Sequence, residues 1–236
     1  MPTVALEICI DAPDGLAVAR TGGADRVELC SALTLGGLTP GPGLVALAAR
    51  SGLPAHAMIR PRPGGFETGQ ADMDACLADI SHMRGAGLVG VVIGAIVGGA
   101  LDEGALAAMV RAAGPMEVTL HRVVDTLPDP VAAVEVAARL GIGRILTSGG
   151  AGRAGEGVGT IAAMVRAARG RVEIMAGGGV TPESAPALLS AGVDALHASA
   201  SAPVIGSEAL GLPPARRTDA DAVRALRAVL SRRAAA

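Results

Sequence analysis

The segment Val-Ala-Leu-Glu-Ile-Cys-Ile at residues 4–10 decides the fold, because it is a β-strand with two unlike faces. Side chains alternate between the faces of a strand, so Leu6, Ile8 and Ile10 share one face while Glu7 and Cys9 share the other. In a barrel surrounded by helices, the apolar face packs against the helices and the other face points inward. The segment therefore predicts a barrel strand with polar residues inside.

Residues 25–30 repeat this pattern, and similar short strands alternate with alanine-rich amphipathic segments along the whole chain. Such alternation is typical of βα units around a parallel sheet. We expect strands at 4–10, 25–30, 54–60, 90–96, 116–122, 144–149, 172–179 and 195–200. We expect helices at 13–22, 41–51, 70–87, 103–113, 129–140, 156–169, 182–191 and 219–233.

Eight such pairs in 236 residues predict an α/β fold, a single (β/α)₈ TIM-type barrel forming one domain over residues 1–236. Residues 201–218 read as a long loop before the last helix, either lying across the barrel or joining a subunit contact. The alternative is an open doubly wound sheet, which the absence of a Gly-x-Gly-x-x-Gly turn after the first strand disfavours.

Composition narrows the range of partners. The net charge is -2 with dispersed charges, and Phe66 is the only aromatic side chain, so we expect no nucleic-acid binding. The apolar stretch at 87–101 is shorter than a membrane span, and the amino terminus lacks an export signal. Three cysteines without such a signal indicate reduced thiols. We expect a cytoplasmic protein that does not enter membranes and binds a small ligand or metal ion.

The inward faces of the predicted strands collect charged and titratable side chains where a barrel ordinarily has aliphatic ones. Buried charges are costly unless they are paired or bind a ligand. The candidates for catalysis, which include one carboxylate just after the fifth strand, are Glu7, Glu28, His56, Arg60, His121, Asp125 and His197. The alternative is a polar layer in which these groups merely neutralise one another.

Segments after the strands offer donors for an anion. Arginines suit carboxylates and phosphates, and glycine-rich turns before helices expose backbone N–H groups. Equally, such glycines can simply make tight turns. The predicted anion-binding residues are Arg60, Arg62, Arg122, Ser148, Gly177, Gly178 and Ser199.

Taken in order, these segments resemble the CutC family. The resemblance is carried by Leu-Glu-Ile-Cys (6–9), Gly-Ala-Asp-Arg-Val-Glu-Leu-Cys (23–30), Gly-Gly-Leu-Thr-Pro (36–40), Ile-Arg-Pro-Arg (59–62), Leu-His-Arg with Asp125, Leu-Thr-Ser-Gly (146–149), Met-Ala-Gly-Gly-Gly (175–179), and His197 with Ser199. It implies a TIM-type barrel, a cytoplasmic location, a homo-oligomer (dimer or higher) and copper homeostasis through Cu(I). The loop after Arg62 departs from the family at Gly65 and Thr68.

Cu(I) prefers thiolate and thioether ligands, and Cys9 and Cys30 sit at matching positions on adjacent predicted strands. We therefore expect these two cysteines to form the copper site, with Met58 and Met175 as weaker candidates and Cys76 as a structural residue. The competing hypothesis is an enzyme for a small anionic metabolite, since copper carriage does not require several arginines. That enzyme would use acid/base chemistry or a divalent metal held by Glu7, Glu28 and the histidines.

Overall fold

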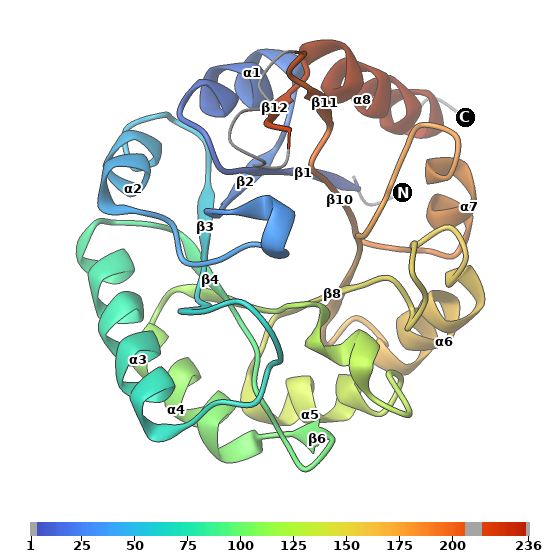
Figure 1. Ribbon diagram of the computed structural model, residues 1–236. Helices are drawn as coiled ribbons and strands as arrows, with labels where there is room; N and C mark the ends of the chain where they lie inside the picture. Colours follow the sequence, from blue (N-terminus) through green and yellow to red (C-terminus); the bar gives the residue numbers. More distant parts are fainter. Residues whose placement is uncertain (1–3, 206–213, 235–236) are drawn as a thin grey trace.

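The computed structural model describes residues 4–205 and 214–234 (Figure 1). Eight parallel strands close into a barrel in the order β1-β10-β9-β8-β7-β4-β3-β2. Helices surround this barrel (Figure 1). The prediction of a closed (β/α)₈ barrel, rather than an open sheet, is therefore confirmed.

The barrel strands are β1 (Ala5–Ile10), β2 (Arg26–Leu29), β3 (Ala55–Met58), β4 (Gly90–Ile93), β7 (Glu117–Leu120), β8 (Arg144–Thr147), β9 (Glu173–Ala176) and β10 (Ala195–Ala198). The outer helices are α1 (Asp14–Gly22), α2 (Pro42–Ala48), α3 (Gln70–Gly85), α4 (Glu103–Ala113), α5 (Ala133–Leu140), α6 (Val158–Ala168), α7 (Ala185–Ser190) and α8 (Ala220–Ala234). Most strands end two or three residues before the predicted boundary, because loop geometry takes over at the carboxyl ends.

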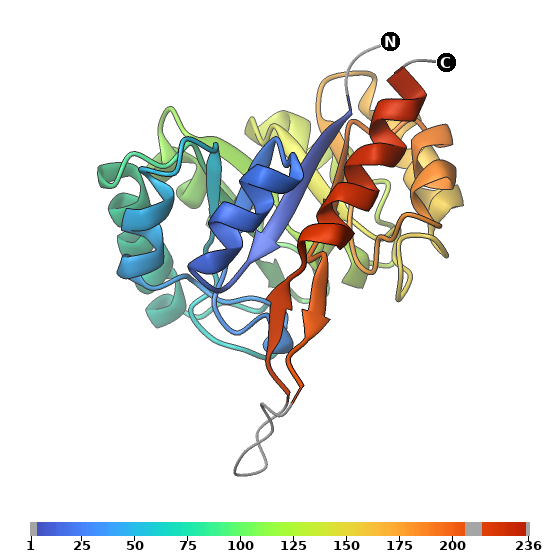
Figure 2. The ribbon, with the colours of Figure 1, turned by 90° about the horizontal axis from the view of Figure 1, so that it is seen from above.

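Short helices and strands lie in the loops at the carboxyl end of the barrel. Two are 3₁₀ helices, η1 (Leu33–Leu35) and η2 (Arg122–Thr126), and two are the strands β5 (Ile96–Val97) and β6 (Ala100–Leu101), which pair as a hairpin. The predicted loop at 201–218 is wrong in part, since β11 (Ser201–Pro203) pairs antiparallel with β12 (Arg216–Thr218). This hairpin projects from the end of the barrel to which β1 points (Figure 2). The rest of that prediction, at 206–213, lies outside the described residues.

The two faces of the strands bury separate sets of side chains. Leu6, Ile8 and Ile10 belong to the large apolar cluster that joins the strands to the helices. Cys9 and Cys30 belong instead to a small cluster inside the barrel. The predicted alternation of outward apolar and inward polar side chains is thus confirmed for β1. It places the polar side chains of β1 and β2 inside the barrel.

A layer of ion pairs lies at the amino ends of the strands, where the Glu117 and Glu173 side chains are about half exposed to solvent. Nη2 of Arg144 donates to Oε2 of Glu117 at 3.1 Å, its Nε donates to Glu173 at 2.7 Å, and Nε2 of His56 lies 2.9 Å from the same Glu117 oxygen. Of the predicted catalytic candidates, only His56 takes part in these ion pairs. Catalysis by His56 has no support here, because its ring is buried in this layer and does not reach the opening above.

Within the described ranges, no helix has both the length and the apolar character that crossing a bilayer requires.

Candidate functional site

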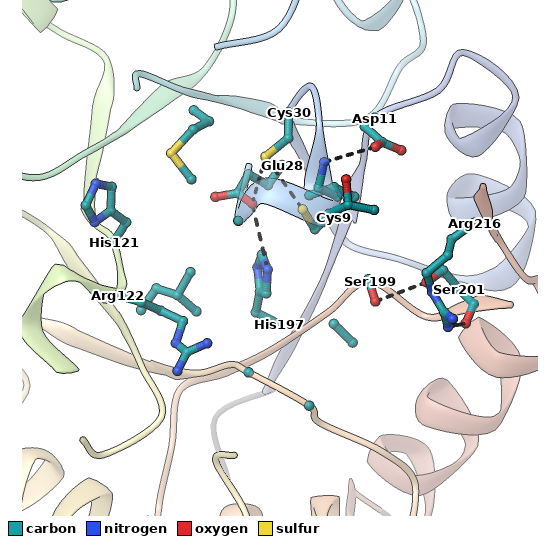
Figure 3. A pocket seen from close by; sticks show the side chains of 18 of the residues that line it. Cys9, Asp11, Glu28, Cys30, His121, Arg122, His197, Ser199, Ser201 and Arg216 are labelled. Atoms are coloured by element: carbon teal, nitrogen blue, oxygen red, sulfur yellow. Dashed lines mark hydrogen bonds and ion pairs between the residues drawn. The ribbon is translucent and has the colours of Figure 1, made fainter. Parts of the chain in front are cut away.

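A cavity of about 580 Å³ opens at the carboxyl ends of the barrel strands (Figure 3). This volume falls within the range of small-molecule sites. The predicted site residues that line it are Cys9, Glu28, Cys30, Arg60, His121, Arg122, Gly178, His197 and Ser199. Those that do not line it are Glu7, His56, Arg62, Asp125, Ser148 and Gly177.

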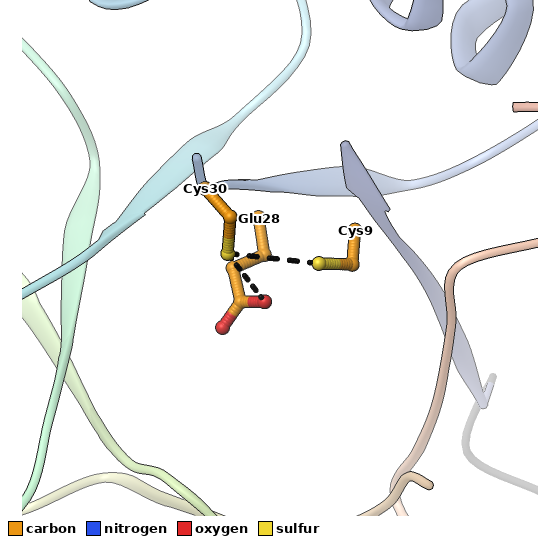
Figure 4. Close-up of side chains that lie close together, drawn as sticks. All are labelled: Cys9, Glu28 and Cys30. Carbon is orange, nitrogen blue, oxygen red and sulfur yellow. Dashed lines mark hydrogen bonds between the residues drawn. The ribbon is translucent and has the colours of Figure 1, made fainter. Parts of the chain in front are cut away.

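The two cysteines face each other on one wall of this cavity (Figure 4). Sγ of Cys9 lies 3.7 Å from Sγ of Cys30, and neither takes part in a disulfide. Their side chains come together because Cys9 is the register partner of Glu28 and Cys30 follows two residues later on the same inward face. Cys30 also donates to Oε2 of Glu28 at 3.4 Å. Sulfurs this close can both contact one ion, and the predicted proximity of the two cysteines is confirmed.

Both thiols hold their protons firmly. The hydrogen bond with Cys30, together with burial, raises the pKa of Cys9 well above its ordinary value. For Cys30, the hydrogen bond with Cys9 lowers the pKa, but burial and the charge of Glu28 outweigh it and raise the pKa to about 12. A metal ion must therefore displace protons from this pair, since the thiolate is the form that binds metals.

Glu7 lies one level below the cavity and supports its wall. Its Oε1 lies 2.7 Å from Nδ1 of His197, and its Oε2 accepts from Nε of Arg26 at 2.6 Å. Burial raises the pKa of Glu7, but the hydrogen bond with His197 and the charges of His197 and Arg26 outweigh burial and hold it far below its ordinary value. Glu7 is thus a fixed anion that orients His197, and catalysis by direct contact with a ligand has no support.

His197 lies between two buried carboxylates. Its Nε2 is 3.7 Å from Oε2 of Glu28, on the side of the ring away from Glu7. Burial lowers the pKa of His197, but the charges of Glu28 and Glu7 and a hydrogen bond with Cys9 raise it well above its usual range. Burial raises the pKa of Glu28. The wall beside the thiols therefore carries the cationic His197 and the Glu28 carboxyl group, and the Glu7 carboxylate lies beneath them.

His121 is a neutral ring with a fixed orientation. Its Nδ1 accepts a hydrogen bond from the backbone N–H of Val123 at 3.0 Å, which caps η2. The ring packs against Phe66 with 4.9 Å between ring centroids, and it fills the space left by the missing side chain of Gly94. Burial, helped by the charge of Arg60, lowers the pKa of His121 to about 3. At neutral pH the ring proton is therefore on Nε2.

Asp125 organises the loops instead of facing a ligand. Its carboxylate accepts hydrogen bonds from the hydroxyl of Thr147, the backbone N–H groups of Ser148 and Gly150, and Nε of Arg122. Ser148 in turn accepts from Nη2 of Arg122 at 2.8 Å. These contacts explain why Asp125 and Ser148 lie outside the cavity lining. They hold the Arg122 guanidinium at its rim.

The two arginines after β3 have different surroundings. Arg60 lines the cavity, donates to the carbonyl oxygens of Leu35, Gly37 and Gly64, and lies over the Phe66 ring at 5.1 Å. It therefore joins two loops as well as facing the opening. Arg62 is instead paired with Asp72 of α3 at 2.8 Å, away from the cavity, so its predicted role in anion binding has no support.

The glycine-rich turn after β9 contributes less than expected. The backbone N–H of Gly177 donates to the carbonyl of Thr147, so it is not available to an anion. Gly178 does line the cavity, and its φ of +99° favours glycine. A Cβ at Gly178 would lie 2.9 Å from Cζ of Arg122, so the glycine is what lets that guanidinium lie against the turn.

Four charged residues of the interior and rim were absent from the sequence-based predictions. Arg26 shares the inward face of β2 with Glu28 and Cys30, so strand alternation was a signal that could have found it. Arg144 was hidden because the polarity of its strand does not alternate clearly. Asp11 and Arg216 line the cavity from loops and the β11–β12 hairpin, where no periodicity applies. Arg216 is held by Ser201, to which its Nε donates at 3.0 Å.

Among the described residues, two groups of ligand atoms are compact enough for a metal ion. One consists of Cys9, Cys30 and Glu28, and the other of Glu7, Glu28 and His197. In the second group both oxygens of Glu7 are already bonded to cationic side chains, which a divalent ion would have to displace. The donor chemistry thus favours a soft ion at the thiols over a hard ion below them.

Comparison with known proteins places these residues in a family context. The model of the CutC family matches residues 4–202. A protein of Rhizobium meliloti named as a CutC family protein is 45% identical over 100% of this chain and 99% of its own length. A relative from Caulobacter vibrioides with the same name is 47% identical over 96% of this chain and 98% of its own.

A solved structure from Streptococcus agalactiae, named as a copper homeostasis protein CutC, matches with a TM-score of 0.79. It is 28% identical and covers 83% of this chain and 98% of that one. Thiamine phosphate pyrophosphorylase from Pyrococcus furiosus, 14% identical with a TM-score of 0.60, shares the barrel fold alone.

Proposed function

Because the chain belongs to the CutC family, we propose that it serves copper homeostasis in the cytoplasm by binding Cu(I) at Cys9 and Cys30. The observation that carries this proposal is the 3.7 Å separation of the two sulfurs on adjacent barrel strands. The name of the Streptococcus agalactiae relative supports the biological role. Cytoplasmic reduction keeps such a thiol pair free of a disulfide.

The surroundings of the thiols suit a monovalent soft ion. When both thiols lose their protons, two negative charges appear beside Glu28, and the cationic His197 offsets part of that charge. Met58 also lines the cavity and offers a thioether, which Cu(I) accepts. Met175 is excluded from this role, because it lies fully buried beneath the cavity with its sulfur beside Arg26.

The test is an anaerobic Cu(I) titration against a competing chelator. We expect one tightly bound ion per chain in the wild type and none in the Cys9→Ser, Cys30→Ser double variant. Cys76→Ser is the matched control, because Cys76 is buried in α3 and lies outside the cavity lining. Equal binding by the double variant would contradict the proposal.

A second candidate function is catalysis on a small anionic metabolite. The observation that favours it is the size and charge of the cavity, whose lining includes Arg60, Arg122 and Arg216. One ion does not fill such a volume, and guanidinium groups bind carboxylates and phosphates. Glu28 would act as the acid/base group, because its carboxyl lines the cavity and burial raises its pKa. A ligand that binds only the folded state raises the midpoint of thermal unfolding of the protein. Differential scanning fluorimetry with anions therefore tests this candidate function.

A further inference from the structure

The cavity wall contains polar atoms that lack hydrogen-bond partners. Among the described residues, the buried polar atoms without a partner include Oε1 of Glu28, Nε2 of His121 and Nε of Arg60, and all three residues line the cavity. Native proteins leave few buried polar groups unsatisfied, because each costs free energy. These three atoms have almost no surface open to a water-sized molecule, so an occupant of the cavity that satisfies them must turn their side chains toward it, and it would then be stabilised by them.

The missing partners are of opposite kinds. Nδ1 of His121 accepts from the backbone of Val123, so the neutral ring carries its proton on Nε2 and needs an acceptor. Nε of Arg60 also needs an acceptor. Oε1 of Glu28 instead needs a donor when the carboxylate is ionised, and Figure 3 shows this carboxyl group among the side chains around the opening. A hydroxyl group both donates and accepts, so a chain of hydroxyls can satisfy all three residues.

The rim of the same cavity is cationic. Arg122 is held by Asp125 and Ser148, and Arg216 is held by Ser201, so both guanidiniums are oriented before any ligand binds. Preorganised donors reduce the entropy lost on binding. Asp11, whose carboxylate accepts from the backbone N–H of Leu33 at 3.2 Å, and Asp125, which is paired with Arg122, offset part of this positive charge, whereas Arg60 and Arg216 have no ion-pair partner among the described residues. The rim therefore suits one anionic group.

We propose that the cavity binds a polyhydroxylated organic anion, a sugar phosphate or a sugar acid, with its hydroxyls on Glu28, His121 and Arg60 and its anionic group at Arg122 and Arg216. This inference rests on the second candidate function and names its ligand class. Phosphate and carboxylate share the anion chemistry of the rim, so the experiment has one arm for each.

Matched pairs of probes separate the hydroxyls from the anion. Glucitol 6-phosphate is compared with hexyl phosphate, and gluconate with hexanoate, by isothermal titration calorimetry on the full chain. We expect at least one hydroxylated probe to bind more than about tenfold tighter than its deoxygenated partner, since several hydrogen bonds distinguish them. The arm that binds tighter identifies the anion.

Two variants test the named residues. His121→Asn keeps an acceptor close to Val123 but removes the Nε2 donor, and we expect it to weaken the hydroxylated probe about threefold to tenfold while leaving the deoxygenated probe unchanged. Arg216→Gln should weaken both members of a pair. His82→Asn is the matched control, because His82 is exposed on α3, and it should bind like the wild type.

The outcomes separate the inference from the candidate function beneath it. Equal binding of hydroxylated and deoxygenated probes, or tighter binding of the latter, would overturn the polyhydroxylated ligand while leaving an anion site. Binding of none of the four probes would overturn both, with the Cu(I) titration unaffected. Normal binding by His121→Asn would remove His121 from the site.

Discussion

Replacing Gly94 by alanine tests the packing that holds His121 in place. A Cβ built on Gly94 would lie 2.2 Å from Cε1 of His121 and 2.6 Å from each ring nitrogen, and these are its three nearest neighbours. The ring cannot simply retreat, because Phe66 lies on it and its Nδ1 is bonded to the Val123 backbone. Overpacking of this kind costs about 1–3 kcal/mol.

For a chain of this length, about 2 kcal/mol corresponds to a fall of about 4–8 °C in the thermal midpoint. Scanning calorimetry of Gly94→Ala should show that fall. Gly159→Ala is the matched control, because Gly159 lies exposed in α6 and an added Cβ there would have no neighbour within 4 Å. Its midpoint should stay unchanged or rise, since alanine favours helices by about 1 kcal/mol over glycine.

A double-mutant cycle identifies the clashing partner. In a His121→Ala background the three contacts disappear, so adding Gly94→Ala should cost less than about 0.5 kcal/mol. The difference between the two backgrounds is the coupling energy between the positions. An equal cost in both backgrounds would refute the placement of His121 against Gly94.

Three further predictions concern the polar interior. Arg26→Met removes one of the two cationic partners of the buried Glu7 carboxylate, so the free energy of unfolding measured with urea at neutral pH should fall by about 3–5 kcal/mol. A fall of less than about 1 kcal/mol would contradict the pairing. The pKa of His121 is lowered to about 3, so the neutral ring contributes stability that is fully present above the unfolded pKa of about 6.5 and is lost as the pH falls toward 3. Nitrogen NMR should therefore show a neutral His121 ring at pH 5. The difference in unfolding free energy between the wild type and His121→Asn should narrow on acidification. Gly178→Ala combines a positive φ with a contact to the Arg122 guanidinium and should lower the thermal midpoint, whereas an unchanged midpoint would show that the turn adapts.

Strand alternation was the most informative signal in the sequence. It placed Glu7, Cys9, Glu28 and Cys30 inside the barrel without any knowledge of the tertiary structure, because an inward or outward direction follows from the parity of the residue number. The same rule could not separate the levels of the barrel. Whether an inward side chain lies at the cavity or beneath it depends on the stagger between strands, which sequence alone does not supply.

His56 and His197 illustrate this limit. Both point inward, but His56 belongs to the ion-paired layer with Glu117 and Arg144, while His197 reaches the cavity beside the thiols. Their local sequences carry no mark of this difference. It arises from the height of each residue in the closed barrel: His56 is the second residue of β3 and lies against Gly90, the first residue of β4, whereas His197 is the third residue of β10 and is nearer the carboxyl ends.

The loop residues show the same limit of sequence-based prediction. The sequence by itself determined the barrel, its helices and the inward direction of the polar side chains, because periodicity is a local property of the chain. The approach of Cys9 to Cys30 depends in addition on the register of β1 against β2. Only the tertiary structure decided that Arg62 turns to Asp72, that Asp125 binds the backbone of the β8 loop, and that Arg216 reaches the cavity from a hairpin. Each of these depends on a partner distant in sequence, and hydrogen-bond geometry between distant segments exists only once the barrel has closed.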